Sequence, residues 1–176
     1  MVRKSGLLNH VNIGSMTRAL FILLVNFFVL KIQAQSYPLL SKGDAEKILG
    51  QPAHLIMSKA ETKDSIVNYR CTYTVNNTGA PAGKESNLYY LLEEYQNKGA
   101  AGKSFRHLVT ANERMPGFYL LPGYGDEAAI QTDSTNFQLI MVRKSDRILR
   151  MKVNKITRTS SLSELKSVTK KIVEQM

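Results

Sequence analysis

The clearest hydrophobic pattern in the chain is a strict alternation over residues 66–75. The alternating positions are Val67, Tyr69, Cys71, Tyr73 and Val75, with polar residues between them. Successive side chains of a strand point to opposite faces, so this pattern predicts a half-buried strand. Residues 87–95 are rich in Leu and Tyr and predict a second strand, after a loop over 76–86 that contains Gly and Pro.

Two further apolar runs, residues 137–143 and 147–154, flank Lys144-Ser145-Asp146. A short polar connection between two such runs predicts a β-hairpin. The inward positions are expected to be Phe137, Leu139 and Met141 on the first strand and Leu149, Met151 and Val153 on the second.

Three segments have the spacing and end signals of helices. Ser41 can cap a helix that ends at Gly50, and residues 99–113 form a second helical pattern that stops before Pro116-Gly117. Ser161 and Glu164 form a capping box at the start of the third. Its apolar stripe is Leu162, Leu165, Val168 and Ile172.

This succession predicts an α+β fold, in which helices cover a mainly antiparallel sheet. The expected order is α-β-β-α-β-β-α, with a further short strand over 118–121 left open. Residues 35–176 are long enough to bury one core and show no internal linker or repeat, so a single domain is expected.

Residues 1–34 have the pattern of a secretory signal peptide: a basic start, an apolar run over 19–30 and Ala34 before a polar segment. The apolar run rises only ~18 Å as a helix, short of a bilayer core of ~30 Å. A retained anchor, a buried helix and a start at Met16 stay open as alternatives. No cysteine lies near Ala34, so the sequence implies no lipid anchor. The ending Ala34-Gln35-Ser36 resembles signal ends common in Bacteroidota, which implies a periplasmic or secreted product.

Charge is distributed unevenly along the chain. The formal net charge is +10, of which residues 1–34 supply four positive charges. Residues 35–142 hold ten basic and eleven acidic residues, whereas 143–176 hold ten basic and three acidic ones. The basic C-terminal part suggests an anionic partner.

The candidate ligand-binding residues on this basic hairpin are Arg143, Arg147, Arg150 and Lys152. Such a face suits lipopolysaccharide, phospholipid headgroups, a polyanionic glycan or nucleic acid. The alternative is a solvated edge whose charge opposes aggregation. Nucleic acid is disfavoured because no aromatic residue is interleaved with these cations.

The loop Gly123-Tyr124-Gly125-Asp126-Glu127 is the most distinctive turn in the chain. Gly123 and Gly125 permit positive φ, and Asp126 and Glu127 could serve a cation or a hydrolytic reaction. One acidic pair falls short of a calcium shell, and a structural turn in which Asp126 bonds the backbone explains the same residues.

Three other motifs give no catalytic constellation. Cys71 lies on the apolar register of its strand and is expected to be a buried, inert thiol. His54 and His107 lack neighbours at metal-ligand spacing. Residues 99–104 resemble the end of a phosphate loop, but Asn97 stands where its first glycine belongs. We therefore expect no metal and no cofactor.

The segments Ala45–Gly50, Cys71–Tyr73 and Gly123–Ala128, followed by the hairpin, resemble small exported bacterial domains of unknown function. These include actinobacterial lipoproteins and extracellular sensor domains of receptor kinases. The resemblance implies a binding or sensing module without catalytic residues.

Together these patterns favour an exported, non-catalytic binding or sensing domain of the cell envelope, with an anionic component or an envelope protein as partner. One alternative is a secreted hydrolase that uses Asp126 and Glu127. Another is a subunit of an envelope complex held through its tyrosine-rich strands, which an outward-facing Tyr89 or Tyr95 in an apolar patch would favour.

Overall fold

The structure is a computed structural model that describes residues 40–75 and 85–176. These residues belong to one compact unit, Tyr37–Met176. The predicted signal peptide and most of the predicted loop over 76–86 lie outside the described residues.

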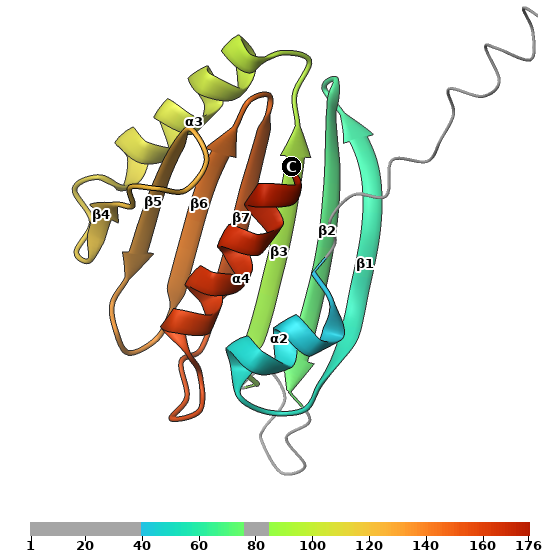
Figure 1. The fold of residues 1–176 in the computed structure, drawn as a ribbon, viewed down its shortest axis with the longest axis vertical. Coiled ribbons are helices and arrows are strands. Elements are labelled where there is room, and N and C mark those ends of the chain that lie inside the picture. The colour runs from blue at the N-terminus through green and yellow to red at the C-terminus, as the bar shows by residue number, and fades with distance from the viewer. Residues whose placement is uncertain (1–39, 76–84) are drawn as a thin grey trace, which may run out of the picture. The chain divides into compact units, whose positions relative to one another are not determined.

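Seven strands form one sheet in which every neighbouring pair is antiparallel (Figure 1). The strands are β1 (Ala53–Lys63), β2 (Ile66–Val75), β3 (Asn87–Glu94), β4 (Phe118–Leu120), β5 (Glu127–Thr132), β6 (Gln138–Lys144) and β7 (Arg147–Val153), and the helices are α2 (Lys42–Leu49), α3 (Lys98–Asn112) and α4 (Leu162–Gln175). The order across the sheet is β1-β2-β3-β7-β6-β5-β4. Two meanders, β1–β3 and β4–β7, therefore meet where β3 pairs with β7. The predicted α+β class with an antiparallel sheet is confirmed.

The two faces of the sheet have separate cores. On the α2/α4 face, α2 and α4 lie over the strands (Figure 1) and pack on Tyr90, Leu149 and other alternate residues. On the α3 face, Phe105 of α3 packs against Met141 and Ile148, which lie between the positions buried under α4. The sheet is thus buried from both sides where the helices lie.

Local signals explain where the helices begin and end. The Ser41 hydroxyl accepts a hydrogen bond from the Asp44 N–H at 3.1 Å, and Gly50 ends α2 with a φ of 66°. The Ser161 hydroxyl accepts from the Glu164 N–H at 3.2 Å at the start of α4. Both N-caps and the apolar stripe of α4 are as predicted.

Two strands are missing from the predicted order. β1 has almost every side chain exposed after Ala53, so it lacks the alternation that marks a half-buried strand. β5 begins at Glu127, inside the segment that was interpreted as loop. The short strand left open over 118–121 is present as β4.

The predicted inward positions on the first hairpin strand were wrong in register. Ile140 and Val142 of β6 enter the main core under α4, whereas Leu139 and Met141 belong to the smaller core under α3. Both faces of β6 are covered, so its sequence shows no alternation that could distinguish the two cores. On β7 the predicted positions Leu149, Met151 and Val153 are buried in the main core.

Candidate functional site

The α3 face of the sheet carries a hollow on each flank of α3. One flank faces the segment from Leu120 to Ala128, and the hollow there, which we call the groove, has a volume of about 640 Å³. The other flank faces β3 and β7, and the hollow there, the crevice, has a volume of about 280 Å³. The groove lies beside the loop with Asp126, and the crevice lies beside the predicted cations Arg150 and Lys152.

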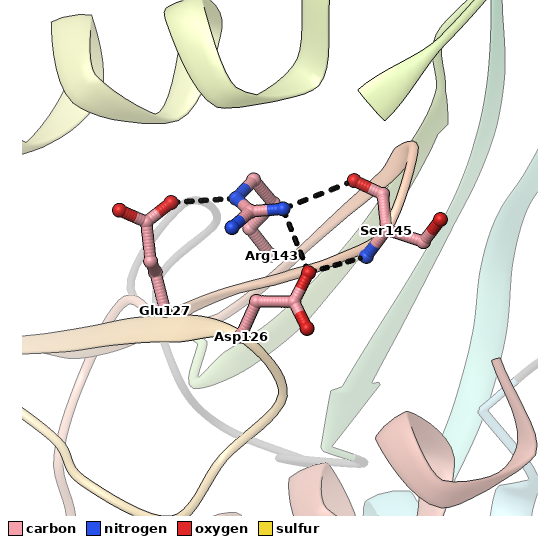
Figure 2. A network of polar contacts seen from close by, with 4 residues as sticks. All are labelled: Asp126, Glu127, Arg143 and Ser145. Carbon is pink, nitrogen blue, oxygen red and sulfur yellow. Dashed lines mark hydrogen bonds and ion pairs between the residues drawn. The ribbon is translucent and has the colours of Figure 1, made fainter. Parts of the chain in front are cut away.

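Arg143 joins the two parts of the chain that carry the predicted site residues (Figure 2). Its Nε donates to Glu127 at 2.6 Å, and its Nη1 donates to Asp126 at 2.8 Å and to the Ser145 carbonyl at 3.2 Å. The Arg143 side chain is only 10% exposed. This cation is therefore committed to a structural network and is removed from the predicted anion-binding face.

The strand register and one glycine bring these groups together. Glu127 of β5 pairs directly with Arg143 of β6, and residues opposite each other in a sheet share a face. The Asp126 N–H donates to the Arg143 carbonyl at 2.8 Å. Gly125 has a φ of 55°, and a Cβ there would lie 2.5 Å from the same carbonyl oxygen. Only glycine permits so close an approach of the loop to the strand.

The Asp126 carboxylate is poorly suited to proton transfer. The Asp126 carboxylate accepts from the Ser145 N–H at 2.9 Å, and this bond, with the charge of Arg143, lowers the pKa of Asp126. A carboxyl group that stays ionised at neutral pH cannot be a general acid, and a lowered pKa makes it a weak base. The backbone bonds of Asp126 hold the loop of Gly123, Gly125, Asp126 and Glu127 in a turn, and this turn forms one wall of the groove.

The four predicted cations do not form one cluster. Arg147 lies on the α2/α4 face, where it contacts Glu94 at 3.2 Å and the Met176 carbonyl at 3.2 Å. Arg150 and Lys152 lie on the α3 face, two residues apart on β7. Of the predicted set, only these last two remain together and in contact with a hollow.

The crevice combines these two cations with apolar and aromatic side chains. Its lining comprises Tyr89, Leu91, Leu108, Asn112, Leu139, Met141, Arg150 and Lys152. Arg150 is paired with Glu93 at 2.9 Å, and the Lys152 ammonium lies 5.3 Å from the centre of the Phe137 ring. Tyr89 of β3 and Phe137, which directly precedes β6, thus supply the aromatic groups that the basic segment lacks in sequence.

Cations from two further strands extend this surface, and sequence reasoning did not identify them as candidates. The register places Lys59 of β1, Arg70 of β2 and Arg150 of β7 in one row across the sheet, with Leu91 of β3 between the last two. The only sequence signal was Arg70, which stands at a polar position of the alternating strand. This row forms only because strands that are distant in sequence pair in the sheet, so the sequence alone does not reveal it.

Tyr89 and Tyr95 have opposite environments. Tyr89 is 40% exposed and lies across from Lys152, whereas Tyr95 is buried and its hydroxyl lies 2.7 Å from that of Ser104. Tyr89 therefore faces outward, with Lys152 opposite it and apolar side chains such as Leu91 beside it in the crevice, and the envelope-complex hypothesis stays a prediction.

Cys71 is buried as predicted, and this burial raises the pKa of its thiol to about 11. Within residues 40–75 and 85–176, no three His, Cys, Asp or Glu residues are close enough to hold a metal ion. In the same part of the chain, no helix has the length and apolar character needed to span a bilayer.

No protein-family model matches the chain. Neither the curated proteins nor the solved structures contain a match to it. The resemblance to exported bacterial domains stays a prediction, and the functional argument depends on the geometry described above.

Proposed function

We propose that this protein is an exported, non-catalytic binding domain that attaches to an anionic phospholipid surface through the uncovered part of its α3 face. We call this part the open sheet face. Its basic residues are Lys59, Lys63, Arg70, Arg150 and Lys152, and its acidic residues are Glu61 and Glu93. The observation that carries the proposal is this excess of five cations over two carboxylates on one side of the sheet.

Ion pairs neutralise only part of this charge. Glu61 lies within 4 Å of both Lys59 and Arg70, and Glu93 pairs with Arg150. The Nε of Arg150 is buried and has no hydrogen-bond partner among the described residues.

Exposed apolar groups among the cations favour a lipid surface over a fully hydrated polyanion. Tyr89 faces outward beside Lys152, and Met57 lies in the same row of the sheet. Cations next to a lipid surface attract anionic headgroups, while tyrosine and aliphatic side chains suit the interface.

The experiment is cosedimentation of the purified protein with vesicles of phosphatidylglycerol and phosphatidylcholine. The double variant Arg150→Gln/Lys152→Gln should bind about thirtyfold more weakly than the wild type, at about 1 kcal/mol for each cation. The matched control is Lys166→Gln/Lys170→Gln on α4, which has the same net charge and should bind like the wild type.

Three results would contradict the proposal. The two double variants could lose the same affinity for anionic vesicles, which would show that net charge attracts the protein and that the open sheet face has no special part. The protein could bind pure phosphatidylcholine vesicles as tightly as vesicles that contain phosphatidylglycerol. The protein could also fail to bind anionic vesicles and instead bind heparin or a single-stranded oligonucleotide, which would assign the open sheet face to another polyanion.

Export itself is proposed from the signal-like pattern of residues 1–34. Mass spectrometry of the N-terminus, after expression in a bacterium and separation of the periplasm, tests it. Cleavage near Ala34 is the expected result, whereas an intact chain retained in the cytoplasm would contradict export.

A further inference from the structure

We propose that the groove on the other flank of α3 is a second, separate binding site, which takes a small amphipathic anion. The apolar body of this ligand would lie along the groove, and its single anionic group would contact Arg106. The groove volume of about 640 Å³ is in the range of small-molecule sites, ~300–1,000 Å³.

Both walls of the groove present apolar side chains. Phe105 and Val109 come from α3, and Leu120, Leu121 and Pro122 come from the segment opposite. Leu120 is 66% exposed, although it is a large aliphatic residue at the rim of a hollow. A ligand with an alkyl or aromatic body would cover this surface and gain the associated hydrophobic free energy.

The charges around the groove indicate the sign of the ligand. The charged residues in its lining are Arg106, Asp126 and Glu127. Both carboxylates are paired with Arg143, and the charge of Lys98 also acts on Asp126. Arg106 is exposed and makes no ion pair or hydrogen bond with any residue that the structure describes. The two carboxylates are offset by the two cations Arg143 and Lys98, which leaves the positive charge of Arg106, and this charge suits a ligand with one negative charge.

The neighbours of Arg106 on α3 reinforce this positive potential. Lys103, Arg106 and His107 line a shallow hollow on the outer side of α3. No Asp or Glu occurs between Lys98 and Asn112, so nothing within the helix offsets the charges of Lys103 and Arg106. A guanidinium can hold a carboxylate, sulfonate or phosphate through two parallel hydrogen bonds.

Isothermal titration calorimetry with decanoate and decanol tests the proposal, because the two probes share an alkyl body and differ in charge. The wild type should bind both, decanoate more tightly. Arg106→Gln should weaken decanoate binding about tenfold and change decanol binding less than twofold. Leu120→Ser should weaken both, and its exposed position lets the variant fold. Lys170→Gln, which removes a positive charge from α4, is the matched control and should bind like the wild type.

Each other outcome overturns a definite part of this proposal. If neither probe binds the wild type, the groove is not a site for such ligands. If Arg106→Gln leaves decanoate affinity unchanged, or weakens decanol equally, Arg106 does not hold the anion. If Arg150→Gln/Lys152→Gln abolishes decanoate binding, the ligand occupies the crevice instead. The vesicle experiment is independent of these results because it concerns the opposite flank of α3.

Discussion

Arg143 carries a full positive charge into a position where its side chain is 10% exposed. Removing a guanidinium from water is costly unless carboxylates and hydrogen bonds replace the lost hydration. Here Asp126, Glu127 and the Ser145 carbonyl supply that replacement. The same three contacts hold the loop before β5, β5 itself and the β6–β7 turn together. Arg143 therefore stabilises the loop that forms one wall of the groove.

The substitution Arg143→Met should lower the free energy of unfolding by about 2 kcal/mol, measured by urea denaturation at pH 7. It leaves Asp126 and Glu127 facing each other without a cation. The loss should be below the ~3–5 kcal/mol typical of fully buried pairs, because both carboxylates reach solvent. Arg158→Met, at an exposed arginine, is the control and should change stability by less than about 0.5 kcal/mol. Equal midpoints for Arg143→Met and the wild type would show that the network contributes nothing.

At the scale of elements, the segments that were predicted correctly are those specified by neighbouring residues. The caps at Ser41 and Ser161 act within one helical turn, and the alternation over 66–75 is visible without knowledge of the partner strands. β1 is held by pairing with β2 rather than by burial of its own side chains, so its sequence lacks a period. The contacts of Arg143 likewise depend on the β5–β6 register, which no local pattern reveals.

The loop before β5 offers a test of such a long-range constraint. Gly125→Ala should lower the free energy of unfolding by about 2–3 kcal/mol, because φ is 55° and the new Cβ would lie 2.5 Å from the Arg143 carbonyl oxygen. Gly123→Ala is the matched control. It also has positive φ, 84°, but nothing lies within 4 Å of its Cβ, so about 1 kcal/mol is expected. Urea denaturation of both variants measures the difference. Equal losses would mean that the loop does not pack closely on β6.

At the scale of the whole molecule, the basic C-terminal part divides between the two faces. The Lys144 ammonium donates to the Val173 carbonyl at 2.7 Å, and Arg147 contacts that of Met176, so both cations lie at the C-terminal end of α4. A helix favours positive charge at that end. Arg150 and Lys152 remain on the open sheet face. The net charge of the sequence therefore overstates the surface that is free for a partner, because several cations stabilise the fold.

Stability of the whole domain should fall in acid, and Asp133 in the β5–β6 connection should contribute to the fall. The Asn136 side chain and the backbone N–H groups of Asn136, Phe137 and Thr135 donate to its carboxylate and hold its pKa far below the usual value. Because the folded pKa lies below the unfolded value of about 3.9, the stabilisation is complete above about pH 4 and is lost as the pH falls towards the folded pKa.

We expect the urea midpoint of the wild type to fall between pH 4 and pH 2. Asp133→Asn keeps an acceptor but does not titrate, so its midpoint should fall less over that range. Glu113→Gln, at an exposed carboxylate outside any ion pair of the described residues, is the control and should follow the wild type. An Asp133→Asn profile parallel to the wild type would show that this carboxylate does not contribute to the acid sensitivity.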